Sequence, residues 1–330
     1  MVIITGSCHN MNKELVNRVF FKSFYIRAVE KKIQLEYKKQ LMRCPIHLSI
    51  GQELSAAIFG EISVTKDYFI SPHRSHAHYL AKNGDLKKFI LELHGKKDGC
   101  SGGRGGSMHL IDLKKGFVGS TAIVANTIPI GVGLAQSIKL KKKKSISLIF
   151  FGDGAVEEGA FWESLNYSIV NSLPVLFVCE NNYYSVYTHL QQRQKIRRIS
   201  KKIKEMGLKT FFCNDRNIKS TFKACSQSYK FVKENRLPAF IEIETHRFFE
   251  HCGPNADDNL KYRNNVPLIK NYKKDPISIL KDYCLKFRLT NPKEINQFDK
   301  KINNKLNKIF DNIKNYKNPT KNDLYNYIYK

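Results

Sequence analysis

The sequence predicts an α/β protein with a mostly parallel central sheet, flanked by helices on both faces and carrying N- and C-terminal helical extensions. Two short apolar runs rich in β-forming residues, SISLIFF at 145–151 and PVLFVCE at 174–180, are separated by a helical stretch at 157–171. A third run, AFIEIET, follows at 239–245. Continuous apolar runs of this length, joined by one helix, are typical of parallel strands that are buried on both faces.

The chain opens with a predicted helix. From Lys13 to Met42, apolar residues recur at helical spacing among charged ones, and Pro45 stops the pattern. We expect a loop over 65–78 and a short helix over 86–93.

The stretch 95–119 is the richest in glycine, which indicates a loop whose backbone approaches another group closely. A buried helix is predicted over 128–140. Its small residues Gly131, Gly133 and Ala135 indicate that another element crosses there at short distance.

Two further helices, 191–206 and 218–234, are expected before the third apolar run. In the tail, Asp275 with Pro276 and Asn291 with Pro292 are typical helix starts, because an acidic or amide cap precedes a proline at the first helical position. The second tail helix carries an apolar stripe that is expected to pack on the body or on a partner subunit: Ile295, Phe298, Ile302, Leu306, Ile309 and Ile313.

The predicted organisation has three parts: a disordered N-terminus over 1–12, an α/β domain over 13–270, and a helical C-terminal extension over 271–330. Whether Met1 or Met11 is the true start is left open. No stretch of about 18 apolar residues and no signal-peptide pattern occurs, so we expect a cytoplasmic protein without a membrane partner. The eight cysteines form no Cys-x-x-Cys pair, which favours free thiols over zinc.

The formal net charge of +27 raises nucleic acid as a partner. However, the basic runs 139–144 and 193–204 contain no aromatic residues on which bases could stack. Solvated basic faces are therefore the favoured interpretation, and nucleic-acid binding is not expected.

Polar residues follow the first two apolar runs directly. Gly152-Asp153-Gly154 comes after the first run, and Asn181-Asn182 comes after the second. Parallel strands end at one edge of a sheet, so Asp153 and Asn182 are expected side by side there. A carboxylate and an amide carbonyl suit magnesium or calcium, and the helix that opens after Gly154 favours a phosphate.

These motifs, with others in the same order along the chain, resemble the alpha subunit of heterotetrameric 2-oxo acid dehydrogenases, the pyruvate, branched-chain and acetoin dehydrogenase group. The resemblance implies the thiamine diphosphate-binding fold and runs from about Leu15 to the tail. The matching motifs are His47-Leu48-x-x-Gly51-Gln52-Glu53, Arg74-x-His76, Gly103-Arg104-Gly105-Gly106-Ser107-Met108-His109, Gly152-Asp153-Gly154-Ala155, Leu173-Pro174 and Cys179-Glu180-Asn181-Asn182.

The resemblance implies the cofactors thiamine diphosphate and Mg²⁺, with the metal held by the side chains of Asp153 and Asn182 and the backbone carbonyl of Tyr184. The remaining implied cofactor contacts are His73, Arg74, Gly154 and Ala155 on the diphosphate, the main chain at Ala122 and Val124 on the aminopyrimidine, and Val186 beneath the bent cofactor. His73 stands where the family often has tyrosine.

His47 and His251 match family histidines that face the reacting end of the cofactor, and the resemblance implies that they are catalytic. His251 could also contact the diphosphate. A structural role is open for His109. The close spacing of His73, His76 and His78 suggests a second metal, which is not expected because magnesium is already assigned elsewhere.

The implied activity is oxidative decarboxylation of a 2-oxo acid with acyl transfer to lipoyl groups. In this family a separate beta subunit supplies the glutamate that activates the cofactor, so an α2β2 heterotetramer served by a lipoyl-bearing acyltransferase is expected. Two alternatives stay open: half of a split transketolase-like or other thiamine diphosphate-dependent lyase, and a basic nucleic-acid-binding or scaffold protein on the same fold. The identity of the 2-oxo acid and of the acceptor is left open.

Overall fold

The computed structural model describes residues 12–42, 44–263 and 275–326, and its centre is a six-stranded sheet in which every pairing is parallel. The strand order is β2-β1-β3-β4-β8-β7. The strands are β1 (Tyr68–Ser71), β2 (Phe117–Ser120), β3 (Ser147–Gly152), β4 (Val175–Asn181), β7 (Lys209–Asn214) and β8 (Ala239–Glu244), and an antiparallel pair is made by β5 (Tyr184–Ser185) and β6 (Thr188–His189).

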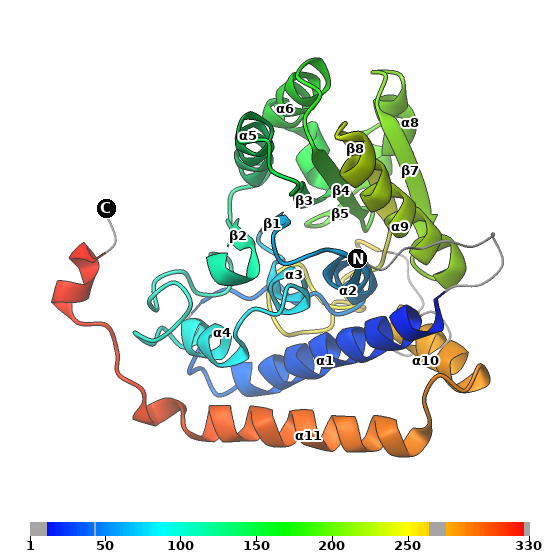
Figure 1. Cartoon of the computed structure of the whole chain (residues 1–330). Coiled ribbons are helices and arrows are strands. Elements are labelled where there is room, and N and C mark those ends of the chain that lie inside the picture. The colour runs from blue at the N-terminus through cyan, green and yellow to red at the C-terminus, as the bar shows by residue number, and fades with distance from the viewer. Residues whose placement is uncertain (1–11, 43, 264–274, 327–330) are drawn as a thin grey trace.

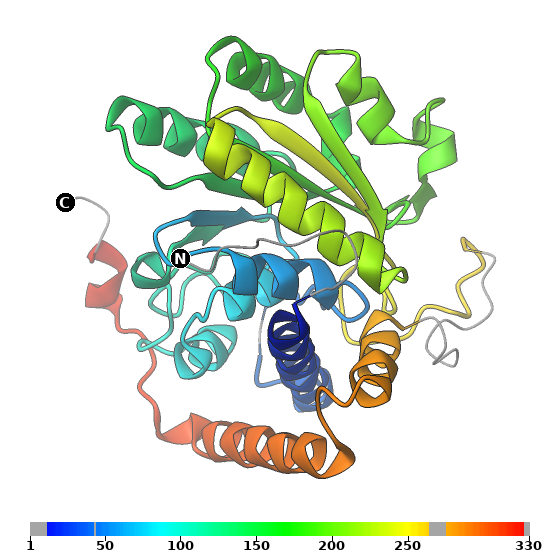
Figure 2. The same ribbon diagram turned by 45° about the vertical axis from the view of Figure 1, so that its right-hand side comes forward.

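Helices cover both faces of the sheet (Figures 1 and 2). They are α1 (Lys13–Tyr37), α2 (Glu53–Ile62), α3 (His76–Ala81), α4 (Leu86–Leu93), α5 (Thr127–Leu140), α6 (Gly159–Val170), α7 (Leu190–Arg193), α8 (Ile199–Lys204), α9 (Ile218–Asn235), α10 (Pro276–Lys286) and α11 (Pro292–Asp311). Short 3-10 helices span Leu113–Lys115, Asp153–Glu157, Ile313–Asn315 and Lys321–Tyr325.

Successive side chains of β3 enter two different cores. Leu148 and Phe150 join the core that contains α1, α2 and α9, whereas Ile149 and Phe151 join the core of α5, α6 and α8. Alternation along a strand that is apolar on both sides requires a helix layer on each face. The predicted α/β fold class is therefore confirmed.

The predicted βαβ unit is present. β3 and β4 are neighbours in parallel register, with Phe151 opposite Cys179 and Gly152 opposite Glu180. The third predicted strand, β8, pairs with the other side of β4. The segments that follow β3 and β4 therefore leave the sheet at the same level and on the same edge.

The helices expected over 86–93, 128–140 and 218–234 are confirmed, as α4, α5 and α9. The predicted close crossing is confirmed at Gly131, where an added Cβ would lie 2.5 Å from the Ile149 side chain. The same prediction is wrong at Gly133, where no atom would lie within 4 Å of an added Cβ. α5 buries one face on the sheet, and Gly133 lies on the other.

Four other local predictions are wrong. The first helix ends at Tyr37 rather than Met42. The segment 65–78 is not a loop, because it contains β1 and the start of α3. The expected helix 191–206 is divided into α7 and α8 by Gln194, whose backbone is extended and whose amide donates to Glu157 at 3.1 Å. The outer strands β2 and β7 were missed, since FVGS is short and β7 begins with the polar pair Lys209-Thr210.

The tail helices pack against the body. The Asp275 and Asn291 side chains cap α10 and α11 as predicted, accepting from the backbone N–H of Ile277 and Glu294. α11 lies alongside α1 in both views, and the rings of Phe298 and Phe21 are 4.7 Å apart (Figures 1 and 2). The apolar stripe of α11 therefore packs against the body of this chain.

Arg27 on α1 ties the first tail helix to the body as well. Its guanidinium bonds both Glu53 at the start of α2 and Asp275 at the start of α10. The predictions of a disordered N-terminus over 1–12 and of a boundary at 270 fall outside the described residues, except at Asn12, whose side chain caps α1.

Candidate active site

A cavity of about 180 Å³ opens at the carboxyl edge of the sheet. The segments that follow four neighbouring strands, β2, β1, β3 and β4, form part of the cavity wall. Every candidate site residue lines this one cavity: His47, His73, Arg74, Ala122, Val124, Asp153, Gly154, Ala155, Asn182, Tyr184, Val186 and His251.

The two segments that carry His47 and His251 are joined by the backbone. His47 forms a parallel bridge with Gly253, whose N–H donates to Ile46 at 2.8 Å. The Arg74 guanidinium donates to the carbonyls of Leu48, at 2.6 Å, and His251, at 3.0 Å. Loops far apart in sequence are thereby fixed against the end of β1.

The oxygen-rich part of the cavity lies after β3 and β4. Asp153 is buried, and its carboxylate bonds the Arg193 guanidinium. Burial raises the pKa of Asp153, and Arg193 offsets part of that rise. The Asn182 carbonyl accepts from the Tyr184 N–H at 3.1 Å, and its amide donates to Gln52 at 3.2 Å. Carboxylate, amide and backbone oxygens fit a hard divalent cation, and Arg193 supplies the positive charge beside Asp153 in this structure.

The backbone after β3 passes very close to β5. An added Cβ at Gly154 would lie 2.8 Å from the Ser185 hydroxyl oxygen, so any larger residue at this position would have to displace the Ser185 side chain. Arg74, which is buried nearby, has its pKa lowered to about 9 by burial and by the charge of Arg247. An anion in the cavity would relieve that burial cost, so the part of the cavity beside Arg74 suits a phosphate.

Several residues in or beside the cavity wall have a strained, left-handed backbone conformation. Val186 has φ +53°, Ala125 has φ +62° and Tyr183, beside Asn182, has φ +68°. Left-handed backbone is rare for any residue with a Cβ and is a true outlier for a β-branched one. Such conformations cluster where a ligand is gripped.

In the same cavity, beside Arg74, three imidazoles form a histidine cluster of His47, His73 and His251. Their ring centroids are 4.6 to 5.3 Å apart. Burial is the largest cause that lowers the pKa of His47, to about 2, and of His73 and His251, to about 3, and the charge of Arg74 lowers all three further. All three rings are therefore neutral at pH 7.

His76 and His78 lie apart from this cluster and act as supports. The His76 ring bonds Glu30 on one side and Ser107 on the other, and Glu30 also accepts the Ser49 N–H. The metal set of His73, His76 and His78 that their spacing suggested is therefore not formed.

His78 bonds Ser71 at 2.7 Å and Glu180 at 3.2 Å, and Glu180 reaches the cavity wall. His109 is exposed and does not line the cavity.

The glycine-rich loop is organised by Glu92, a residue that the sequence analysis did not single out. The buried Glu92 carboxylate accepts four backbone N–H groups, from Ser101, Gly103, Gly105 and Gly106, at 2.7 to 3.2 Å. This loop places Met108 in the cavity wall. Its glycines are therefore used to wrap a carboxylate of the chain itself.

Several other wall residues were missed. Gln52, Met108 and Glu180 stood inside the quoted motifs, so a signal for them existed. Arg193, which does not line the cavity but bonds Asp153, had no such signal, because it lies in a basic run that is interpreted as a solvated face.

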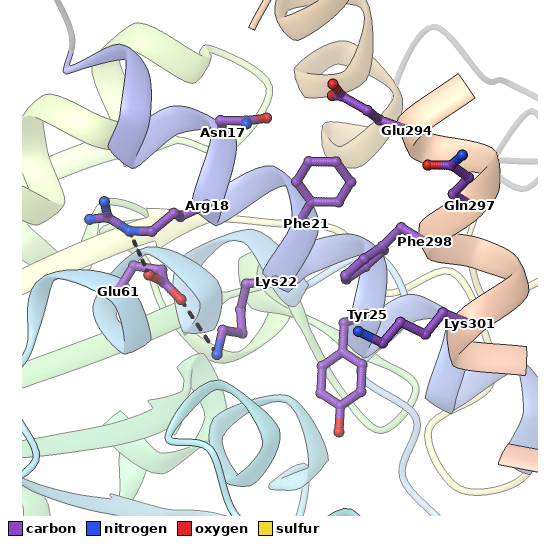
Figure 3. A pocket seen from close by; sticks show the side chains of 10 residues that line it. All are labelled: Asn17, Arg18, Phe21, Lys22, Tyr25, Glu61, Glu294, Gln297, Phe298 and Lys301. Atoms are coloured by element: carbon purple, nitrogen blue, oxygen red, sulfur yellow. Dashed lines mark hydrogen bonds and ion pairs between the residues drawn. The ribbon is translucent and has the colours of Figure 1, made fainter. Parts of the chain in front are cut away.

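A larger groove of about 620 Å³ lies elsewhere, between α1 and α11 (Figure 3). Phe21, Phe298 and Tyr25 form its apolar floor, and Glu61 pairs with Arg18 and Lys22 at its edge. It contains none of the candidate site residues. Among the described helices, none combines the length and the apolar character needed to cross a membrane.

Comparison with known proteins gives one consistent result. The family model described as dehydrogenase E1 component matches residues 22–322. The pyruvate dehydrogenase E1 component subunit alpha of Rickettsia bellii is 30% identical over 318 residues, which cover 95% of this chain and 97% of that protein. The mitochondrial pyruvate dehydrogenase E1 component subunit alpha of Pisum sativum is 30% identical over 315 residues, covering 94% of this chain and 77% of that protein.

Proposed function

This chain belongs to the dehydrogenase E1 component family, and we propose that it is the alpha subunit of a pyruvate dehydrogenase-like 2-oxo acid dehydrogenase. Enzymes of this family depend on thiamine diphosphate. The observation that carries the proposal is the single cavity at the carboxyl edge of the sheet, into which every residue implied by the family resemblance projects.

Mg²⁺ is the proposed metal. Asp153 and Asn182 would hold it through side-chain oxygens and Tyr184 through its backbone carbonyl, a donor set suited to a hard cation. The buried Asp153 supports this assignment, because a carboxylate at that depth needs a positive charge beside it. Arg74, His73 and the backbone at Gly154 and Ala155 would hold the diphosphate.

The remaining proposed contacts follow the shape of the cavity. The main chain at Ala122 and Val124 would contact the aminopyrimidine, and Val186 would support the bent cofactor from below. When bound, thiamine diphosphate supplies the stabilisation of the carbanion that decarboxylation requires. His47 and His251 line the same cavity, where each could donate a hydrogen bond to the substrate or exchange a proton with it.

An alpha subunit of this family has a beta subunit as its partner. Apolar side chains at the mouth of the cavity support a contact there, since Val124 and Val186 line the cavity yet are 45% and 41% exposed, and the adjoining Ile123 and Tyr187 are exposed as well. Exposed apolar groups gathered at one place mark an interaction surface. We propose that the beta subunit covers this rim in an α2β2 assembly and supplies the activating glutamate. We also propose that a lipoyl-bearing acyltransferase accepts the acyl group.

The test is to purify the chain together with the beta-type chain of the same cells and to measure 2-oxo acid oxidation with ferricyanide. Pyruvate and branched-chain 2-oxo acids are compared, and lipoamide then replaces ferricyanide. We expect turnover that requires both chains, thiamine diphosphate and Mg²⁺, with pyruvate the preferred substrate. Asp311→Asn, an exposed change on α11, serves as the matched control for Asp153→Asn.

A pair of chains that binds thiamine diphosphate and Mg²⁺ but oxidises no 2-oxo acid would refute the proposal. Transfer of a two-carbon unit from a ketose phosphate by the same pair would identify a split transketolase-like enzyme. Salt-sensitive nucleic-acid binding that Asp153→Asn does not change, without cofactor binding, would favour the basic binding protein.

A further inference from the structure

We propose that a basic pocket at the amino edge of the sheet binds a compact polyphosphate group, either the triphosphate of a nucleotide or a free polyphosphate. The pocket has a volume of about 560 Å³, within the usual range for small-molecule sites. It lies where β3, β4 and β8 begin, at the edge opposite the candidate active site. Six positive side chains line it: Lys139, Lys142, Lys143, Lys144, Lys233 and Arg236.

The fold gathers these charges from two distant parts of the chain. Four of the lysines belong to the basic run 139–144, whose sequence alone indicates a solvated face, and the other two residues come from the end of α9. No acidic residue is among the described residues that line the pocket. The positive charges are therefore concentrated around one hollow rather than spread over an open surface.

Three helices, α5, α6 and α9, end at this pocket. Just after them, Lys142, Ser172 and Arg236 adopt left-handed backbone conformations, with φ of 49°, 47° and 58°. Glycine is the usual residue there, because a Cβ in this conformation costs about 1 kcal/mol. Two positive side chains thus line the pocket from positions at which the backbone alone would favour glycine.

Part of the charge has a structural use. The Lys139 ammonium donates to the carbonyl of Asn171 at 2.5 Å. The Arg236 guanidinium donates to the carbonyls of Lys143, at 2.8 Å, and Lys144, at 3.3 Å. These contacts satisfy carbonyl groups near the helix ends, and they hold the lysine-rich loop against the end of α9.

The remaining charge exceeds what the chain itself needs. Lys233 pairs with the buried carboxylate of Asp67 at 2.5 Å. Among the described residues none forms an ion pair or a side-chain hydrogen bond with Lys142, Lys143 or Lys144. A helix end contributes about half a negative charge, so three helix ends and Asp67 offset fewer than half of the six positive charges. An anion in the pocket would neutralise the excess.

The shape and chemistry of the pocket favour a polyphosphate. Lysine binds phosphate as a point charge, and a polyphosphate brings several negative charges within reach of the three unpaired lysines. Buried Ile138 and Pro174 add an apolar part that a nucleoside can contact. No aromatic residue is among the described lining residues, so the stacking surfaces on which a nucleic-acid strand depends are missing here.

Binding of ATP and of inorganic tripolyphosphate to the full chain together with its beta subunit is measured by isothermal titration at about 150 mM salt. We expect one site per alpha subunit, with a Kd below about 1 mM for both ligands. Equal affinities would assign recognition to the phosphate chain alone, and tighter binding of ATP would add a nucleoside contact. Saturating thiamine diphosphate and Mg²⁺ should displace neither ligand, because the two sites lie at opposite edges of the sheet.

Lys142→Gly separates binding from folding. Because glycine is favoured at this left-handed position, the variant should unfold at about the same urea concentration as the parent. Its affinity for tripolyphosphate should fall about 10-fold, since a hydrogen bond to a charged group is lost. Lys142→Gln combined with Lys144→Gln should lower the affinity further.

Lys300→Gln combined with Lys305→Gln is the matched control, because both lysines are exposed on α11 and the change in net charge is the same. We expect its affinity to stay within about 2-fold of the parent. Equal losses in the control and in the pocket variants would overturn the proposal, as would displacement of ATP by thiamine diphosphate or tighter binding of a single-stranded oligonucleotide. These readouts need no turnover, so their failure leaves the proposed dehydrogenase function intact.

Discussion

The wall of the cavity and the network directly behind it use the same residue types in opposite ways. Behind the wall, the Glu92 carboxylate accepts four backbone N–H groups, and the His76 ring is bonded on both sides. In the wall, the Nδ1 of His47 has no partner among the described residues, and the Asp153 carboxylate depends on Arg193 from a distant segment.

The difference separates polar groups that stabilise the folded chain from polar groups that are available to bind a ligand. A buried group that is satisfied by its own chain stabilises the folded state, whereas one left unsatisfied reduces stability until something binds. Substitutions behind the wall should therefore reduce stability, and substitutions in the wall should reduce affinity.

The largest effect on stability is expected for Glu92→Ala. It leaves four N–H groups of the glycine-rich loop without their acceptor, and each buried donor left unsatisfied typically costs about 1–3 kcal/mol. Urea unfolding followed by circular dichroism measures the change. Glu163→Ala on the exposed side of α6 is the control, with an expected change within about 0.5 kcal/mol. Equal midpoints for the two variants would contradict the role of Glu92.

Asp153→Asn should give the opposite result. Removing the carboxylate takes away the main oxygen ligand of the proposed Mg²⁺ site, so the affinity for thiamine diphosphate in the presence of Mg²⁺ should fall more than about 100-fold, or roughly 2.7 kcal/mol. Stability should stay within about 1 kcal/mol of the parent, because a buried charge is removed as well. Isothermal titration and urea unfolding measure the two quantities. Unchanged affinity would remove Asp153 from the metal site.

The same division explains what the sequence could and could not predict. The wall residues occupy short motifs directly after apolar runs, and the parallel pairing of β3 with β4 follows from those runs, so Asp153 and Asn182 were found. The supporting contacts join residues that no local pattern connects: Glu92 holds a loop that follows it in sequence, and Glu30 on α1 reaches His76 on α3. Such pairs arise from the packing of whole elements.

Similar reasoning accounts for the errors in secondary structure. β2 and β7 lie at the two edges of the sheet, where short or polar sequences suffice, whereas the inner strands must be apolar on both faces. The break between α7 and α8 depends on the contact between Gln194 and Glu157, which only the folded chain brings together.

Asp215 is an exception to this division, since its side chain is buried with the charges of Glu53 and Asp275 acting on it and is poorly compensated. Burial, together with the charges of Glu53 and Asp275, raises its pKa to about 8, and Thr245 offsets only part of the rise. A carboxyl group whose pKa is higher in the folded than in the unfolded state stabilises the fold fully at low pH, and this contribution is lost as the pH rises toward 8.

Asp215→Asn should therefore stabilise the protein at pH 8 relative to the parent, by about 1–3 kcal/mol, and should have much less effect near pH 4. Denaturation at several pH values measures the difference. A constant difference between variant and parent across this range would show that Asp215 does not titrate in the folded state.

The smallest effect is expected at Arg193, which does not line the cavity but bonds the wall residue Asp153. Its guanidinium bonds both Asp153 and Glu157, so it occupies the place of a cation beside the proposed Mg²⁺ ligand. Arg193→Gln removes this competitor and should raise Mg²⁺ affinity a few-fold, equivalent to less than about 1 kcal/mol. Titration with Mg²⁺ at fixed thiamine diphosphate detects the shift. A weaker Mg²⁺ affinity would mean that Arg193 assists cofactor binding.

The position of α11 along α1 has a consequence during synthesis of the chain. α1 is synthesised long before α11, the helix that covers its outer face through Phe298 on Phe21. At about 5–20 residues per second the interval is roughly 10–50 s. Throughout that interval the nascent chain displays the phenylalanines of α1 to the surrounding medium, and this is where a chaperone that recognises apolar helices has the longest opportunity to bind.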